Sequence, residues 1–274
     1  MTAAVSVAAR EVAEELVEGD VPLWVHPEWR DAFSWLVQGT TGRGTGDEPF
    51  DLGLSGAQPV GKVLDRWRAL LAATGMATVI HSRQVHGTEL WVHEGGAAPG
   101  VLVMHGYDGH LTVRPGVLLS VGVADCVPVF LVDPARRAVA VLHSGWRGTA
   151  AGITERGIRR LVDGGSAGAA ALRLHCGPAI CGRCYEVGPE VHAAIHPDRE
   201  PPAGPTPIDV RAAIAERAVG LGLRPENVTV STHCTRCGPP DFFSHRGGDR
   251  GRQMGVLGMR EPARRVNDPL SAPG

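Results

Sequence analysis

Short apolar runs separated by Gly, Pro and Asp residues fill the middle of the chain and predict β-strands. They fall at residues 77–81, 89–93, 101–104, 117–123, 127–132 and 138–143, with two later runs at 171–175 and 228–232. A multistranded, partly buried sheet is the most economical explanation for them.

Helical periodicity is confined to a few segments. Apolar positions recur at helical spacing over residues 64–74, and Gly75 follows as a C-cap. Residues 149–162 and 209–222 predict two more helices, each with its first residue as the N-cap. Because these helices interrupt the strands irregularly, the pattern favours an α+β fold over a regular βαβ alternation.

Composition and charge limit the partners of this chain. A formal net charge of -2 and a pI near 6.6 provide no basic field for nucleic acid or an anionic membrane. The acidic first twenty residues lack the apolar core of a signal peptide, and Asp125 and Pro128 interrupt the most apolar stretch. We therefore expect a cytoplasmic protein, in which the six cysteines bind metal, catalyse or pack.

The strongest local pattern is His-Ser-Gly-Trp-Arg-Gly-Thr at residues 143–149, where an apolar strand gives way to a helix. Gly145 allows close approach of a ligand to the backbone, and Arg147 lies beside the exposed N–H groups of a helix start. The segment predicts a phosphate or carboxylate site. An ordinary tight turn with a surface arginine is the alternative.

Three residues near strand ends form a candidate metal site. His86 and Cys126 offer, with His143, the imidazole and thiolate groups that suit zinc or copper, and three ligands leave one coordination position open. Their spacings of 40 and 17 residues match no local metal motif. The same residues would also suit a cysteine nucleophile activated by a histidine.

Two CxxC pairs offer a competing metal site. Cys181 and Cys184 form the first pair, and Cys234 and Cys237 form the second. Four cysteines suit a structural zinc, but the 49 residues between the pairs exceed the usual spacing of a zinc ribbon. From the sequence, the role of these pairs stays open.

A glycine-rich loop near the C-terminus carries further polar side chains. Ser244, Arg246 and Arg252 lie in it and predict contacts with a substrate. A solvated basic loop is the alternative. The tryptophans are too dispersed to form a nucleic-acid stacking platform.

Five ordered blocks of residues resemble the multicopper polyphenol oxidase, or laccase-domain, family of purine nucleoside phosphorylases. They are residues 84–87, 124–128, 143–149, 177–180 with 184–188, and 242–244 with 251–253. The resemblance implies a single α+β domain of mixed β-sheets with flanking helices over residues 38–262. Residues 1–37 would be an N-terminal extension or first elements, and residues 263–274 a C-terminal tail.

By the same resemblance, His86, Cys126 and His143 hold zinc, with copper as the alternative metal. The implied activity is a transferase reaction, phosphorolysis of adenosine, inosine or methylthioadenosine to a free base and a sugar 1-phosphate. Adenosine deamination, a hydrolase reaction, is the second implied activity, and Asp125 is a candidate acid–base group by adjacency. Arg147 and its turn would belong to the phosphate or nucleoside pocket.

Two segments depart from the family pattern. Residues 50–53 read Phe-Asp-Leu-Gly where the family has Leu-Asn-Leu-Gly, and residues 245–249 replace a Tyr-Arg-Arg-Asp run. These departures put the preferred nucleoside in doubt. The alternatives to a phosphorylase are a copper-dependent polyphenol oxidase and a non-catalytic zinc-binding protein of envelope or division processes. The sequence leaves the oligomeric state open.

Overall fold

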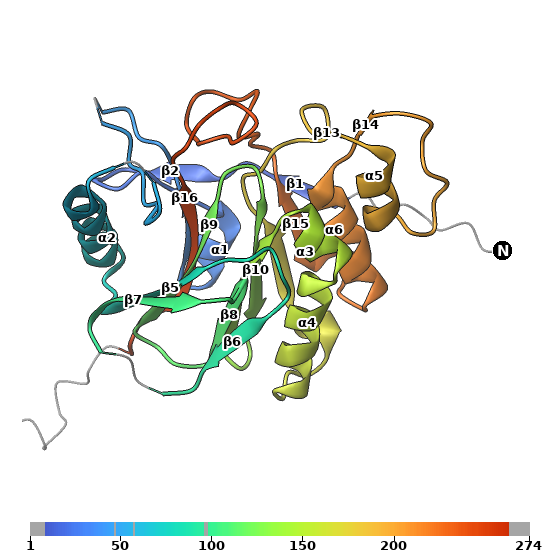
Figure 1. The fold of residues 1–274 in the computed structure, drawn as a ribbon. Helices are drawn as coiled ribbons and strands as arrows, with labels where there is room; N and C mark the ends of the chain where they lie inside the picture. Colours follow the sequence, from blue (N-terminus) through green and yellow to red (C-terminus); the bar gives the residue numbers. More distant parts are fainter. Residues whose placement is uncertain (1–8, 47, 57, 96–97, 263–274) are drawn as a thin grey trace, which may run out of the picture.

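Two seven-stranded mixed sheets form the middle of the computed structural model (Figure 1), which describes residues 9–46, 48–56, 58–95 and 98–262. The first sheet has the spatial order β1 (Arg10–Val12), β15 (Val228–Ser231), β12 (Arg173–Cys176), β10 (Val127–Asp133), β11 (Ala138–Ser144), β8 (Gly109–Thr112) and β6 (Leu90–His93). The second has the order β2 (Glu15–Val17), β3 (Leu23–Val25), β4 (Leu36–Thr41), β16 (Gln253–Met259), β9 (Val117–Val123), β5 (Thr78–Arg83) and β7 (Gly100–His105).

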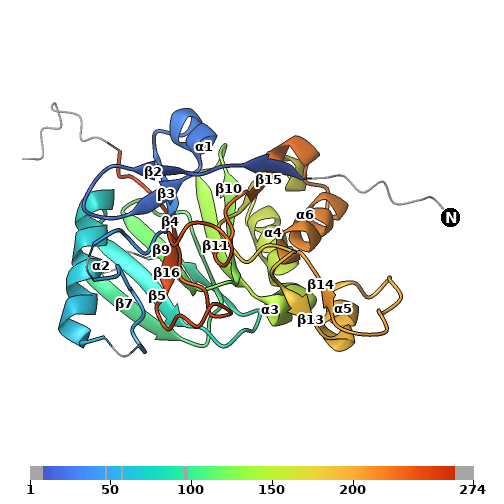
Figure 2. The same ribbon diagram turned by 90° about the horizontal axis from the view of Figure 1, so that it is seen from above.

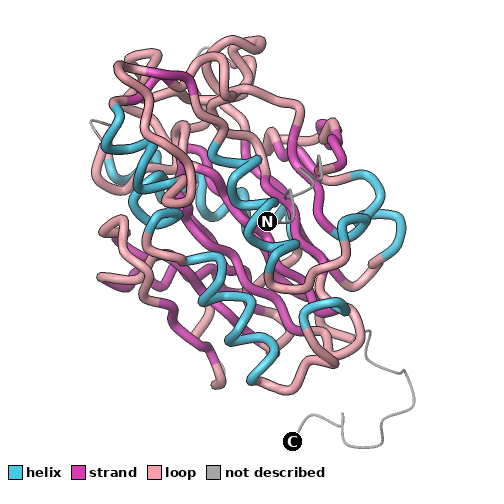
Figure 3. The backbone as a smooth tube through the Cα atoms, turned by 90° about the vertical axis from the view of Figure 1, so that its right-hand side faces the viewer, coloured by secondary structure: helices cyan, strands magenta, loops and turns pink. Residues whose placement is uncertain are grey.

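Helices cover the outer face of each sheet (Figures 1 and 2). On the second sheet lies α2 (Val60–Thr74), and against the first lie α4 (Ile153–Asp163) and α6 (Val210–Gly220). The shorter helices are α1 (Pro27–Ala32), α3 (Trp146–Ala150) and α5 (Pro189–Ile195), with 3₁₀ turns at Ala169–Ala171 and Pro225–Asn227. A small sheet pairs β13 (Glu186–Val187) with β14 (Thr206–Pro207). The tube in Figure 3 shows strands running between helices.

Side chains of β10 point alternately to the two faces of the first sheet, and both faces are buried. This explains why the sequence of the strand is a continuous apolar run. Val129 and Leu131 pack toward the helices, whereas Phe130 and Val132 pack into the core that the two sheets share. Strands β9 and β16 contribute to this shared core from the other sheet. Successive side chains point to opposite faces, and both faces are covered, so every position of β10 is buried.

The predicted α+β fold with mixed sheets and flanking helices is confirmed, and the strands predicted at 117–123, 127–132 and 138–143 form at those places. The single helix expected over 149–162 is wrong. The chain instead forms α3 and α4, separated at Gly152, whose φ of 84° no helix accepts. Thr149 lies inside α3, and Gly152 is the N-cap of α4.

Strands at the two ends of the chain were not predicted. β4 and β16 pair with each other in the centre of the second sheet, and every residue of both strands is buried. Gly39, Gly255 and Gly258 interrupt their apolar pattern. A Cβ at Gly258 would lie 2.5 Å from the carbonyl oxygen of Val117, so close packing of the strands requires the glycine there.

Residues ahead of position 38 are part of the sheets. β1 joins the first sheet beside β15, and β2 and β3 join the second beside β4. The predicted C-terminal tail, 263–274, lies outside the described residues. In the described part of the chain, no helix combines the length and apolar character needed to cross a membrane.

A buried carboxylate fixes the N-terminal segment to the first sheet. Glu14 accepts hydrogen bonds from Nε2 of His175 at 2.8 Å and from the hydroxyl of Ser231 at 2.7 Å. Burial would raise the pKa of Glu14, but hydrogen bonding to His175 and Ser231 outweighs burial and lowers it. The ionised carboxylate is therefore the form that the fold stabilises.

We expect Glu14→Gln to destabilise the fold by about 1–3 kcal/mol at pH 7, because a charged hydrogen-bond acceptor is replaced by a neutral amide. A group with a lowered pKa contributes its stabilisation above its usual value, here 4.5, and loses it as the pH falls toward the lowered value. Urea unfolding should therefore show a difference in the free energy of unfolding between the variant and wild type that is full at neutral pH and narrows as the pH falls below 4.5. Glu11→Gln, at an exposed position of β1, is the control. An equal difference at all pH values would contradict the assignment.

Candidate metal centre

Three predicted ligands meet where the chain passes from the second sheet to the first. Cys126 lies between β9 and β10, and His143 lies on β11, where it pairs with Pro128 of β10. His86 follows the end of β5. The ligand atoms of all three residues lie within 4.8 Å of one another. The strand ends thus bring together residues that are 40 and 17 positions apart.

A buried aspartate that the sequence did not single out orients two of these ligands. Asp108 precedes β8 and is 0% exposed. Its Oδ1 lies 2.9 Å from Nδ1 of His143 and accepts the backbone N–H of His86 at 2.9 Å. Its Oδ2 accepts the backbone N–H groups of Val85 and Gly87. Because Nδ1 of His143 faces Asp108, its Nε2 is left to face the ligand cluster.

Charge interactions stabilise the deprotonated thiol. Burial would raise the pKa of Cys126, but His143 and His86 outweigh it and lower that pKa to about 6. For His143 the directions are reversed. Burial alone would lower its pKa, but the interactions with Cys126 and Asp108 outweigh burial and raise the pKa to about 9. A thiolate between two imidazoles is the form in which cysteine binds a metal or attacks as a nucleophile.

The backbone around the cluster is unusual in two places. His86 and Asp125 have φ values of 60° and 81°, in a region that residues other than glycine rarely occupy. Such positions concentrate at functional sites. Gly145 packs so closely that a Cβ there would lie 2.8 Å from Sγ of Cys126, which explains why the turn after His143 requires glycine.

Both carboxylate oxygens of Asp125 accept hydrogen bonds from other residues of the protein. Its Oδ1 accepts a hydrogen bond from the hydroxyl of Thr235 at 2.6 Å, and its Oδ2 accepts the backbone N–H of Arg246 at 2.7 Å. These bonds tie the turn before Cys126 to two distant loops. The arrangement supports a positioning role, whereas its predicted acid–base role remains a prediction.

Tyr185 is a site residue that sequence reasoning placed in a motif but did not single out. It lines a small cavity of about 40 Å³ together with Cys126, Trp146 and Ile180. Burial raises the pKa of its phenol, and the nearby Cys126 thiolate raises it further. Its hydroxyl therefore keeps its proton at neutral pH and can act as a hydrogen-bond donor beside the cluster.

Two of the predicted arginines stack on aromatic residues that line this cavity. The guanidinium of Arg246 lies 4.9 Å from the ring centroid of Tyr185, and that of Arg147 lies 4.4 Å from the ring centroid of Trp146. The positive charges of both arginines lower the pKa of Tyr185 and so partly offset the effect of burial. Both arginines are exposed, so their positive charge lies on the solvent side of the site.

The other two predicted substrate contacts are used within their own loop. The hydroxyl of Ser244 accepts the backbone N–H of Gly247 at 3.0 Å. Arg252 donates to the carbonyl oxygens of Arg250 and Gly251 through Nη1. Its backbone N–H donates to Asp51, so the loop contacts the segment at residues 50–53 that departs from the family pattern.

The donor set fits zinc. One thiolate and two imidazoles are borderline-soft ligands, and three of them leave a coordination position for a substrate or solvent. The hydrogen bond from a ligating histidine to a buried carboxylate is the usual support of such sites.

Comparisons with known proteins agree with the resemblance seen in the sequence. Residues 38–260 match the family described as multi-copper polyphenol oxidoreductase laccase. A purine nucleoside phosphorylase of Deinococcus radiodurans is 37% identical over 204 residues, which are 69% of this chain and 74% of that protein. Adenosine deaminase RL5, from an unknown prokaryotic organism, is 37% identical over 152 residues, 52% of this chain and 58% of that protein.

A solved structure shares the fold. The crystal structure of YlmD from Geobacillus stearothermophilus has a TM-score of 0.80 and 26% identity, and the match covers 90% of this chain and 100% of that chain. The family match spans most of the described residues and includes all three candidate ligands. The chain therefore belongs to the multi-copper polyphenol oxidoreductase laccase family.

Proposed function

We propose that this protein is a zinc-dependent purine nucleoside phosphorylase that cleaves adenosine, inosine and methylthioadenosine to a free base and a sugar 1-phosphate. Adenosine deamination is its second activity, and the cytoplasm is its place of action. The observation that carries the proposal is the cluster of His86, Cys126 and His143 beside a small cavity, on whose aromatic residues two exposed arginines stack. The names of two relatives, a purine nucleoside phosphorylase and an adenosine deaminase, support the same reactions.

In this proposal, zinc is held by the three ligands and supplies Lewis acidity to the group at its open coordination position. Asp108 holds both histidines in position, because its carboxylate bonds to Nδ1 of His143 and accepts the backbone N–H of His86. The thiolate of Cys126 neutralises one of the two positive charges of the ion. The remaining positive charge, with the two arginines, favours an anionic co-substrate at the site.

Phosphorolysis requires phosphate oxygen to bond to the anomeric sugar carbon while the bond from that carbon to the purine nitrogen breaks. Arg147 and Arg246 are exposed at the solvent side and would bind phosphate through charge-assisted hydrogen bonds. Nη1 of Arg246 already donates to the carbonyl oxygen of Glu186 at 3.0 Å, so its other guanidinium nitrogens would make this contact. Tyr185 lines the cavity, and its protonated hydroxyl would donate a hydrogen bond to the departing purine, whose nitrogen gains electron density as the bond breaks. In deamination, water would attack the purine carbon that carries the amino group, so that a carbon–oxygen bond forms there and ammonia leaves as the carbon–nitrogen bond breaks.

Two alternatives have distinct requirements. A multicopper oxidase needs several copper ions for four-electron chemistry, and the described residues offer only one mixed histidine–cysteine cluster besides a group of four cysteines. A non-catalytic zinc-binding protein would show metal-dependent stability without nucleoside turnover.

Replacing Cys126 by Ala removes one of three ligands, so we expect the loss of about one zinc per chain and at least a hundredfold loss of adenosine turnover, with and without phosphate. Metal content by mass spectrometry and chromatography of adenine and inosine measure both effects. Cys176→Ala is the matched control, because Cys176 is a buried thiol on β12 outside the candidate site. Zinc lost without any turnover in wild type would favour the non-catalytic alternative, and unchanged zinc would exclude this metal site.

Replacing Asp108 by Asn keeps its size but removes the charge that orients His143. We expect a zinc affinity about 10–100-fold weaker, measured by competition with a chelator, and activity that largely returns when zinc is added in excess. Recovery by zinc separates a positioning role from general damage to the fold. Asp133→Asn is the control, because Asp133 is also buried but accepts backbone N–H groups in the turn after β10. An unchanged affinity would contradict the role of Asp108.

Arg147→Ala tests the phosphate site. A charged hydrogen bond contributes about 1.5–3 kcal/mol, so the KM for phosphate should rise about 10–100-fold. Deamination, which uses no phosphate, should change by less than about threefold under this assignment. The control is Arg156→Ala, an exposed arginine on α4 paired with Glu89. Equal losses in both reactions would show that Arg147 does not act on phosphate.

A further inference from the structure

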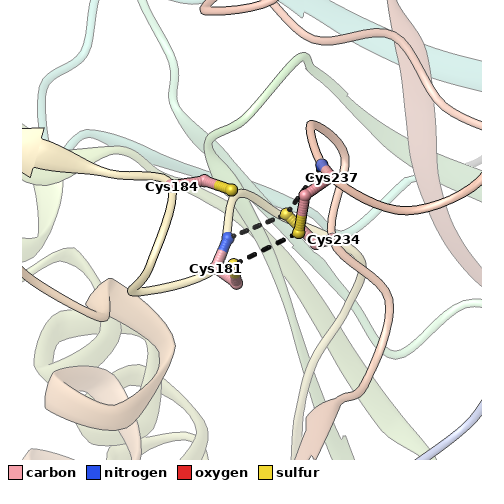
Figure 4. Close-up of side chains that lie close together, drawn as sticks. All are labelled: Cys181, Cys184, Cys234 and Cys237. Atoms are coloured by element: carbon pink, nitrogen blue, oxygen red, sulfur yellow. Dashed lines mark hydrogen bonds between the residues drawn. The ribbon is translucent and has the colours of Figure 1, made fainter.

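Four cysteines outside the site described above converge on one point (Figure 4). The sulfur atoms of Cys181, Cys184, Cys234 and Cys237 all lie within 4.8 Å of one another. They come from two loops that are 49 residues apart in sequence. Such a group of thiols has no part in the proposed reaction and requires its own explanation.

Sheet topology explains why the two loops meet. β12 and β15 are parallel neighbours in the first sheet, so the segments that follow them leave the sheet side by side. An isolated bridge between Ala179 and Cys234 continues this pairing beyond the strands. The backbone N–H of Thr235 also donates to the carbonyl oxygen of Ala179 at 3.2 Å. The large sequence separation is therefore no obstacle to a shared site.

Each CxxC segment forms a tight turn that aims both of its sulfur atoms the same way. The N–H of Cys184 donates to the carbonyl oxygen of Cys181 at 2.9 Å, and the N–H of Gly238 donates to that of Cys234 at 3.3 Å. A Cβ at Gly238 would lie 2.7 Å from the carbonyl oxygen of Cys234, so the second turn requires glycine there.

Backbone donors surround one of the sulfur atoms. The N–H groups of Cys181, Arg236 and Cys237 point at Sγ of Cys234 at 3.3, 3.4 and 3.5 Å. Three N–H donors on a single sulfur stabilise negative charge, because a neutral thiol is a weak acceptor. The turn therefore suits a thiolate, which is the form that binds a metal.

The distance between two of the thiols, one from each loop, matches tetrahedral zinc. With zinc–sulfur bonds of about 2.3 Å, the sulfur atoms at the corners of a tetrahedron are about 3.8 Å apart. Sγ of Cys181 lies 3.8 Å from Sγ of Cys237, and this pair joins the two loops. We propose that these four cysteines bind a second, structural zinc ion, with all four coordination positions filled by protein.

This second zinc would hold residues of the first site in place. Tyr185 directly follows Cys184, and Thr235, between the ligands of the second turn, donates to Asp125 beside Cys126. Nη1 of Arg236 also donates to the carbonyl oxygen of Cys184 at 2.9 Å and joins the two turns. Removing the ion would free both loops, so catalysis would fall although His86, Cys126 and His143 still bind metal.

Metal analysis of single variants tests the proposal. We expect about two zinc ions per chain in wild type and in Cys176→Ala, about one in Cys126→Ala, about one in Cys237→Ala and none in the double variant Cys126→Ala/Cys237→Ala. Cys237→His, which restores a zinc ligand, should regain the second ion. Adenosine turnover should fall in Cys237→Ala and recover in Cys237→His.

X-ray absorption on the Cys126→Ala protein keeps the proposal testable if Cys237→Ala fails to fold, because this variant leaves the four cysteines intact. We expect zinc with four sulfur neighbours at about 2.3 Å and no nitrogen neighbours. Iron in place of zinc would overturn the assignment of the metal. A Cys126→Ala protein without metal, with these cysteines as free thiols or as disulfides by intact mass, would overturn the site itself.

The two metal sites are tested by different variants, so either proposal can be disproved without the other. Loss of zinc in Cys126→Ala concerns the site of His86, Cys126 and His143, and loss in Cys237→Ala concerns only the four cysteines. The inferred structural zinc does not depend on which reaction the protein catalyses.

Discussion

Three residues, at positions 124–126, carry the chain from β9 in one sheet to β10 in the other. Packed sheets lie about 10 Å apart, and an extended chain advances about 3.3–3.6 Å per residue, so three residues are enough for this connection but leave it short. Asp125 in this connection has a φ of 81°, and hydrogen bonds from Thr235 and Arg246 to its carboxylate hold the turn. The same crossing places Cys126 at the rim where the ends of both sheets meet.

Loops, rather than long helices, build the site around that crossing. A carboxylate at Asp108 joins the segment of His86 to the ring of His143, and the turn at Gly145 is packed against the sulfur of Cys126. Loops of this kind need strong local constraints, because they lack the repeating hydrogen bonds of a helix or a sheet. Buried charge at Asp108 provides one such constraint, and the inferred zinc at the four cysteines would provide another.

The two clusters of candidate metal ligands differ in the number of side chains that they provide. The cluster of His86, Cys126 and His143 has three candidate ligands, and two exposed arginines stack on aromatic residues of the adjacent cavity, an arrangement that would suit the anionic co-substrate of the proposed reaction. The group of four cysteines has a complete set of protein ligands, as a structural site requires. Tyr185 connects them, because it follows a ligand of one cluster and lines the cavity beside the other. Stability and chemistry would therefore be coupled through a few residues of one loop.

The sequence by itself determined the α+β class, the central strands and the helix capped by Asp209, because these depend on local periodicity and local turn residues. It also determined the family, because five short motifs occur in the family's order and each can be recognised from its own residues. It did not reveal β4 and β16, because glycines interrupt their apolar pattern at positions where another strand leaves no room for a side chain.

Only the tertiary structure decided which distant residues meet. The strands divide between two sheets, and this division brings Asp108 to His143 and the first cysteine pair to the second, across 35 and 49 residues of sequence. No motif in the sequence around Asp108 marks its carboxylate, because its partners are backbone N–H groups of the loop after β5 and the ring of His143 on β11. Spacing along the chain could name the candidate ligands, but the register and order of the strands set their distances.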